Sequence, residues 1–240
     1  MRRNVLMAVV VGVGMCVIHP PGAAEGKGVG GTITGQVQFT GTPPARAPVK
    51  MRADPTCQQK HAEPGLSEEV MVNENGTLRN VFVYVKEGLA GSFPGSTTPV
   101  VLDQDGCRYR PRVVGLQVNQ PLEIRNSDAT LHNVNVKPTA NPSFNIAQPV
   151  AKMKTTKKFA KPEVMVKFKC NVHPWMGAYA GVLEHPFFGV SNDSGSASLS
   201  GLPAGTYIVE VWHEMYGTQV QSVTLGDGES TSIEFSYQGQ

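Results

Sequence analysis

Residues 168–176 read Phe168-Lys-Cys170-Asn-Val-His173-Pro-Trp-Met176. A thiolate, an imidazole and a thioether are the soft-to-borderline donors that suit copper as it changes between its two oxidation states. Two residues separate each of these three side chains from the next, so a tight turn can direct all of them at one ion. The stretch therefore predicts that Cys170, His173 and Met176 bind a single copper ion.

A copper site of this type needs one more imidazole from a distant strand, which completes a trigonal plane of two histidines and one cysteine. The segment Leu131-His132-Asn133-Val134 supplies one at the start of an alternating strand expected at 132–136. A second strand, expected at 163–170, ends at Cys170. We therefore expect His132 to complete the ligand set.

The first 24 residues have the three parts of a secretory signal. Arg2 and Arg3 form the positive region, residues 5–18 the apolar region, and residues 22–24 a small-residue cleavage site. An apolar run of about 14 residues is short for a membrane span, which needs roughly 20. We therefore expect a periplasmic or secreted protein with a cleaved signal peptide and no stable membrane insertion.

The cysteine count indicates one disulfide. Cleavage of the signal would leave Cys57, Cys107 and Cys170, and three thiols in an oxidising compartment suggest one bridge and one cysteine with another role. Because Cys170 lies in the ligand-like cluster, Cys57–Cys107 is the economical pairing. It would close a loop of 50 residues (107 minus 57), which stabilises the fold by about 4 kcal/mol in the chain-entropy model.

Two other interpretations of the cluster fit less well than copper. Free cysteine and methionine are commonly buried as ordinary core residues, but that would leave an unpaired thiol beside a histidine in an oxidising compartment. Zinc is a poor match, because structural zinc sites prefer cysteine and histidine alone. Copper remains the expected cofactor, one ion per chain.

The ligand motif resembles that of the cupredoxins, the type 1 blue copper proteins, with an amicyanin-like C-x2-H-x2-M loop. The upstream segment from Gly115 to Val134 is also similar to the cupredoxin strand pair that ends in the first histidine ligand. The resemblance covers about residues 78–186 and implies a Greek-key β-sandwich. It also implies the role of each ligand. His132, Cys170 and His173 would be the three equatorial ligands, and Met176 would be the weak axial ligand.

The same resemblance implies roles for neighbouring residues. Asn126 would tie the first-ligand loop to the cysteine loop, and the Asn133 amide would point at the Cys170 sulfur. Electrons would pass through His173, whose ring should lie nearest the surface. The partner would then be a redox protein, such as a cytochrome or a periplasmic oxidoreductase, that docks near His173.

Outside this part, the chain is patterned as short strands and turns, so the whole fold is expected to be all-β. An N-terminal part at 32–77 combines a strand at 32–40 with a Pro-rich segment that small cupredoxins lack. Residues 187–240, with turns at 192–195 and 201–205, resemble a carboxypeptidase-regulatory-like (transthyretin-like) β-sandwich. They are too few for a whole module, and the strand at 32–40 looks like its missing first strand.

Two further strand expectations concern the middle of the chain. A strand at 78–85 should place Val81, Val83 and Val85 on one face and Phe82 and Tyr84 on the other. Strands at 113–118 and 122–125 should pair with each other around the Asn-Gln-Pro turn that separates them.

A lysine-rich segment follows the first histidine motif. It can be interpreted as a strand edge protected from aggregation by charge, or as a docking patch for an acidic redox partner. Its five lysines are Lys152, Lys154, Lys157, Lys158 and Lys161.

Charge and histidine content exclude several classes of function. The formal net charge of +2 argues against a nucleic-acid binder. The histidines outside the signal are too few for a multicopper oxidase or nitrite reductase, so no catalytic residues are expected. Those that are not ligands are expected to be structural, with His61 belonging to the disulfide region rather than to a second metal site: His61, His185 and His213.

These observations favour a one-electron carrier. Two other classes of function remain open. One is periplasmic copper storage or delivery, in which the site would be exposed and labile. The other is a non-redox adhesion or polymer-binding module, in which the transthyretin-like part would make the contacts.

Overall fold

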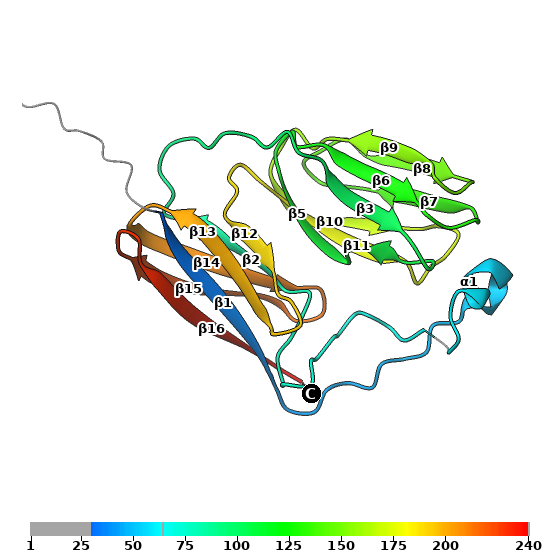
Figure 1. The fold of residues 1–240 in the computed structure, drawn as a ribbon, viewed down its shortest axis with the longest axis horizontal. Coiled ribbons are helices and arrows are strands. Elements are labelled where there is room, and N and C mark those ends of the chain that lie inside the picture. The colour runs from blue at the N-terminus through cyan, green and yellow to red at the C-terminus, as the bar shows by residue number, and fades with distance from the viewer. Residues whose placement is uncertain (1–29, 64, 240) are drawn as a thin grey trace, which may run out of the picture.

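The structure is a computed structural model, which describes residues 30–63 and 65–239. Its regular secondary structure is almost entirely β-strand, which confirms the all-β prediction. The strands form two sandwiches that lie side by side (Figure 1). Among the described residues, no helix has the length and apolar character to span a membrane. The predicted signal peptide at 1–24 lies outside the described residues.

The larger sandwich consists of two sheets around one apolar core. One sheet has the strand order β5-β11-β10-β7-β8, and the other has the order β4-β3-β6-β9. Leu116, Ile124, Val136 and Phe168 are fully buried between them. The strands are β3 (Val100–Gln104), β4 (Tyr109–Arg110), β5 (Val113–Gln117), β6 (Leu122–Asn126), β7 (His132–Val136), β8 (Phe144–Gln148), β9 (Lys154–Lys157), β10 (Glu163–Lys169) and β11 (Gly177–Leu183).

The smaller sandwich combines the N-terminal strand with the C-terminal part of the chain. Its sheets have the orders β13-β1-β16 and β12-β2-β14-β15. β1 alternates between buried and half-buried residues, and it pairs with β13 antiparallel and with β16 parallel. The strands are β1 (Gly31–Thr40), β2 (Phe82–Glu87), β12 (Phe188–Val190), β13 (Ser196–Leu202), β14 (Gly205–His213), β15 (Gly217–Leu225) and β16 (Ser230–Gln238).

β2 differs from the sequence-based expectation in its location. It was expected in the larger part at 78–186, but it pairs with β12 and β14 of the smaller sandwich. Val83 and Val85 point into the core of that sandwich, whereas Phe82 and Tyr84 pack against β5 and β11 of the larger one. Because apolar residues occupy both faces, the sequence pattern could not distinguish a strand of one sandwich from a strand between two.

The expected pairing of β5 with β6 is wrong. β5 pairs with β11, whereas β6 pairs with β3 and β9 in the opposite sheet. The connection between β5 and β6 crosses from one sheet to the other. At its start the Val118 amide donates to the Leu183 carbonyl of β11, and at its end the Pro121 carbonyl accepts from the Val100 amide of β3. The turn residues therefore connect the two layers of the sandwich rather than a hairpin.

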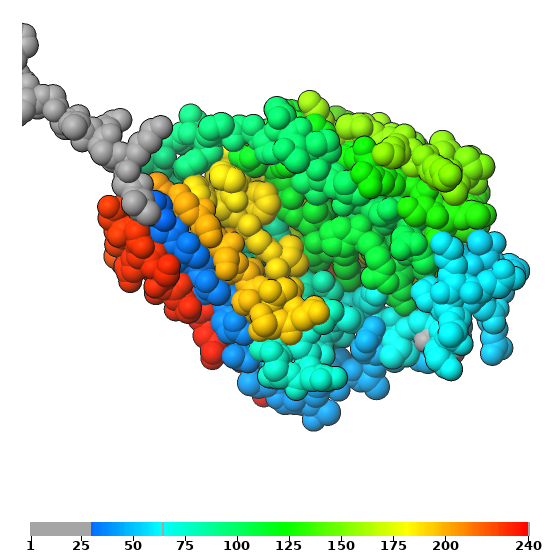
Figure 2. All heavy atoms as spheres, in the orientation of Figure 1, coloured from blue at the N-terminus to red at the C-terminus, as the bar shows by residue number. Residues whose placement is uncertain are grey.

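The chain between β1 and β2 leaves the smaller sandwich and reaches the far end of the larger one before it returns (Figure 1). We call residues 48–63 the capping segment; it contains η1 (Met51–Ala53) and α1 (Pro55–Gln59). Figure 2 shows its atoms on the outer end of the larger sandwich. A disulfide between Cys57 and Cys107 joins it to that sandwich, with 5.5 Å between the two Cα atoms.

Candidate metal centre

The four predicted ligands lie at the end of the larger sandwich that the capping segment covers. His132 is the first residue of β7, and Cys170 directly follows β10, which is the hydrogen-bonded neighbour of β7. His173 and Met176 lie in the loop from β10 to β11. This loop is tight because the Met176 amide donates to the His173 carbonyl at 2.9 Å and the Cys170 amide donates to the Met176 carbonyl at 3.3 Å.

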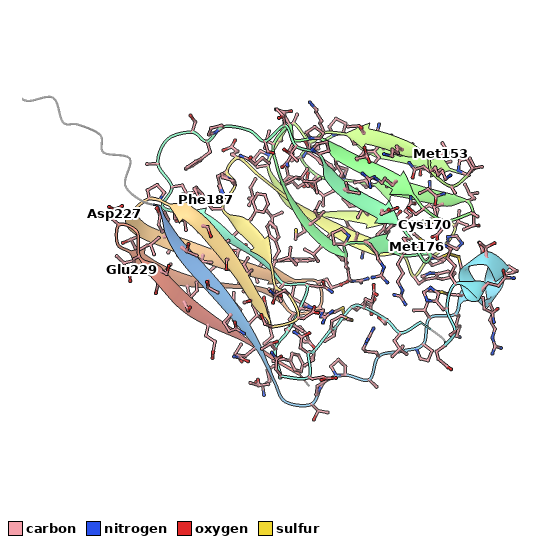
Figure 3. All side chains as sticks on the ribbon, viewed as in Figure 1. Met153, Cys170, Met176, Phe187, Asp227 and Glu229 are labelled. Carbon is pink, nitrogen blue, oxygen red and sulfur yellow. A yellow bond between two sulfur atoms is a disulfide. The ribbon has the colours of Figure 1, made fainter. Side chains whose placement is uncertain are left out.

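The ligand atoms converge on one buried point. The Nδ1 atoms of His132 and His173 are 2.9 Å apart, and the Cys170 Sγ lies 3.8 Å from the His173 Nδ1. All four predicted ligands are buried: the exposed fraction is 0% for His132, 2% for His173 and Met176, and 3% for Cys170. Figure 3 shows Cys170 and Met176 close together at the end of the sandwich nearest α1.

The outer nitrogen of each imidazole contacts a carboxylate. The His132 Nε2 lies 2.9 Å from an Asp128 oxygen, and the His173 Nε2 lies 3.0 Å from an Asp54 oxygen. An ionised carboxylate can only accept a hydrogen bond, so each Nε2 carries a proton and donates it. In a neutral ring this leaves the Nδ1 lone pair directed at the centre. Two such lone pairs beside a thiolate require a cation between them, either a proton or a metal ion.

Both carboxyl groups are ionised at neutral pH. Burial raises the pKa of Asp54, but hydrogen bonds from Thr130, His173 and two backbone amides outweigh burial and lower it to about 2. Burial also raises the pKa of Asp128, and hydrogen bonds from His132, Lys60 and two amides again lower it well below its ordinary value. The Lys60 ammonium lies 2.6 Å from the fully buried Asp128.

The Cys170 sulfur is surrounded by donors. The amides of Asn133 and His173 each lie 3.4 Å from Sγ, so the contact expected for the Asn133 amide is present. Burial raises the pKa of the thiol, but the side chains of His132 and His173 and the hydrogen bonds from these amides lower it to about 6. Cys170 is therefore a thiolate at neutral pH, which is the form that binds metals.

The metal-free protein should show this ionisation directly. We expect the Cys170 thiol to titrate at about pH 6, against about 8.5 for an unperturbed cysteine. Because the folded-state pKa is depressed, the ionised thiol stabilises the metal-free fold fully above about pH 8.5, and this contribution is lost as the pH falls through about 6. Ultraviolet absorbance of the thiolate measures the midpoint, and Cys170→Ser should lack the transition. A midpoint near 8.5 would contradict the geometry.

Asn126 has a different role from the one expected. Its side-chain amide donates to the carbonyls of Thr130 at 3.0 Å and Gln148 at 2.8 Å, and therefore ties the first-ligand loop to β8. The cysteine loop is instead tied by Asn133, whose side-chain oxygen accepts from the Asn171 amide at 3.1 Å. Asn133 can reach the cysteine loop because β7 and β10 are adjacent strands. Asn126 cannot, because it ends β6 in the opposite sheet.

The expectation that His173 lies nearest the surface is wrong. Its ring is enclosed by the capping segment, with Asp54 on Nε2 and the Cys57 Sγ 3.5 Å from the same nitrogen. Trp175 packs beside the ring, with centroids 5.1 Å apart, and its indole nitrogen donates to the Cys107 carbonyl. The disulfide joins the capping segment to the sandwich over a ring that the family resemblance places nearest the surface.

The remaining histidines and the lysines lie outside the centre. His61 binds the Gly106 carbonyl at 2.8 Å and belongs to no group of candidate metal ligands among the described residues. His185 and His213 each accept a hydrogen bond from a nearby backbone amide. The lysine-rich segment includes β9, which is an edge strand of its sheet. Charged edge strands resist pairing with other chains.

The donor set fits copper. One thiolate and two imidazoles with a thioether nearby match a copper site of the His2Cys type, whereas zinc sites rarely include methionine. The contacts of Asp54 and Asp128 with the two imidazoles were not predicted from the sequence. Asp128 precedes His132 by four residues in a loop, a spacing that could have indicated the contact, but Asp54 lies in a Pro-rich segment with no pattern that points to the site.

Comparisons with known proteins give structural similarities alone. No family model matches the chain, and no curated protein matches it. A copper-containing nitrite reductase from Thermus scotoductus is similar over 40% of this chain, with 21% identity and a TM-score of 0.32; the match spans only 25% of that enzyme. A copper(I) form of an amicyanin variant matches 42% of this chain and 97% of its own, with 16% identity and a TM-score of 0.32.

A purple cupredoxin from Nitrosopumilus maritimus is similar over 35% of this chain and 97% of its own, with 17% identity and a TM-score of 0.30. These neighbours are cupredoxins or contain copper by their names. At TM-scores near 0.3 they do not assign the chain to a family.

Proposed function

We propose that the protein is a periplasmic type 1 copper protein that carries single electrons between redox partners. One copper ion would be held by His132, Cys170 and His173, with Met176 as the weak axial ligand. The observation that carries the proposal is the convergence of two imidazole Nδ1 atoms on one buried thiolate.

Copper in such a site supplies one-electron exchange between its two oxidation states. The residues of the chain keep the donors in place while the charge changes. Asp54 and Asp128 hold the rings through Nε2, and the Asn133 and His173 amides hold the sulfur. Because the donors are fixed by these neighbours, little rearrangement accompanies electron transfer, and burial keeps water away from the ion.

Burial favours a carrier over a storage or delivery protein. A delivery site must release its ion to another protein, which requires ligands that a partner can reach. Here all four proposed ligands are at most 3% exposed, and a disulfide joins the covering segment to the sandwich. An electron can cross such a cover, whereas an ion cannot without opening it.

The lysine-rich segment at 152–161 is the surface that we propose for a redox protein with an acidic face. Charge complementarity speeds the encounter of such partners and makes it sensitive to salt. Lys154 lies 3.3 Å from Glu123, and the Lys157 ammonium lies over the Phe144 ring. Lys152, Lys158 and Lys161 are therefore the lysines to replace first in a test of docking.

The axial residue gives a test of the carrier proposal. Met176→Leu should keep copper and colour while raising the reduction potential, because loss of a weak donor destabilises the more highly charged oxidised ion. Met176→Gln should lower the potential, because a harder oxygen donor favours that ion. We expect shifts on the order of 59 mV, which is tenfold in a one-electron equilibrium.

Voltammetry of the two variants, together with titration of the reduced metal, measures both effects. Unchanged potentials combined with sharply weaker binding of reduced copper would contradict the carrier and support a delivery protein, in which the thioether holds the reduced ion.

A further inference from the structure

Asp54 links the capping segment to the proposed ligand His173. Its Oδ1 accepts from the amides of Thr56 at 2.8 Å and Cys57 at 3.3 Å, and so caps the N-terminus of α1. Its Oδ2 accepts from the Thr130 hydroxyl at 2.8 Å and lies 3.0 Å from the His173 Nε2. Four donors therefore fill the four acceptor positions of one carboxylate.

These contacts fix both the orientation and the tautomer of His173. The two backbone amides of α1 and the Thr130 hydroxyl hold the carboxylate in place. Its Oδ2 can therefore stabilise only a ring that carries a proton on Nε2. A neutral ring then directs its Nδ1 lone pair at the centre that it forms with His132 and Cys170. The Asp54 side chain is 19% exposed and the ring is 2% exposed, so water competes weakly for this bond.

The charge of Asp54 acts on the same centre. A carboxylate bonded to a ligand ring increases the basicity of that ring, and its negative charge favours the oxidised ion over the reduced ion. Glu63, in the same segment, is exposed, so solvent screens its charge. The two acids therefore allow a matched comparison within one segment.

We propose that Asp54 is a positioning residue, which holds His173 in its ligating tautomer from outside the copper-binding sandwich and biases the centre towards oxidised copper. The proposal rests on the copper site proposed above. It also gives the capping segment a function: the disulfide-linked segment exists to bring a carboxylate to a ligand that would otherwise face solvent.

The test compares Asp54→Ser with Glu63→Gln in the full mature chain. Serine caps a helix as well as aspartate does but is too short to reach His173, so it separates the two roles of Asp54. Asp54→Asn is a second variant of unchanged size; with its oxygen kept on the α1 cap, its NH2 group would face the His173 Nε2 and disfavour a proton there.

Nitrogen NMR of the metal-free protein should show His173 protonated at Nε2 in the wild type and in Glu63→Gln. In Asp54→Ser and Asp54→Asn the population should shift towards the Nδ1-protonated form. In the copper-loaded proteins, the ratio of the affinities for oxidised and reduced copper should fall about tenfold in both Asp54 variants. Loss of such outer contacts costs 10–100-fold in metal affinity. The tenfold fall corresponds to a rise of about 59 mV in potential.

An unchanged His173 tautomer and an unchanged potential in both Asp54 variants, with only a lower unfolding temperature, would overturn the proposal and leave Asp54 as a helix cap. Absence of copper binding by the wild type would overturn the proposed function instead. The tautomer in the metal-free protein would still decide whether Asp54 positions His173.

Discussion

Replacement of Cys170 with serine should abolish the visible colour of the oxidised, copper-loaded protein completely. The colour of a type 1 site arises from charge transfer between the cysteine thiolate and copper, and a hydroxyl group cannot provide it. Copper binding should weaken by at least about 100-fold, because the loss of even outer contacts costs 10–100-fold in affinity. Visible absorption and a copper titration measure the two effects.

Two controls make this result specific to the ligand. Val172→Ala changes an exposed side chain in the same loop and should leave colour and affinity unchanged. Near-ultraviolet circular dichroism of metal-free Cys170→Ser should match that of the wild type, because serine fits the space of the thiol. Persistence of the intense band in Cys170→Ser would show that the ligand assignment is wrong.

Removal of the disulfide should have the largest effect on stability. Cys57→Ala combined with Cys107→Ala frees the capping segment, and the loop of 50 residues predicts a loss of about 4 kcal/mol in the free energy of unfolding. The same change should expose His173. The bridge holds Asp54 and Cys57 over the His173 ring, and the Cys107 carbonyl accepts from the Trp175 indole beside it.

Urea unfolding of the metal-free protein measures the first effect, and the rate at which a histidine-selective reagent modifies His173 measures the second. His132 serves as an internal control, since it is fully buried under Asp128 within the larger sandwich. A double variant as stable as the wild type, with His173 still protected, would mean that packing rather than the disulfide holds the segment.

The local features of this protein could be predicted from its sequence. The period of apolar residues predicts the alternation of β1 and the two faces of β2. It also predicts the strand that begins at His132 and the strand that ends just before Cys170. The convergence of His132, Cys170 and His173 was predicted from donor chemistry and spacing, and the structure brings their ligand atoms within 4.8 Å of one another.

The features that the sequence did not reveal depend on contacts between distant parts of the chain. The assignment of β2 to the smaller sandwich depends on which strands pair with it, and apolar residues on both of its faces do not encode the partner. The burial of His173 depends on Asp54, which lies more than a hundred residues upstream in a segment without periodicity. The pairing of β5 depends on β11, which was not recognised as a strand because small residues occupy it.

The visible absorption spectrum of the copper-loaded wild-type protein, recorded with the copper content of the same sample, tests the central claim most directly. The account predicts one copper per chain and an intense charge-transfer band in the oxidised protein, which disappears on reduction and returns on oxidation. A protein that binds no copper, or binds it without an intense visible band, would contradict a type 1 site formed by His132, Cys170, His173 and Met176.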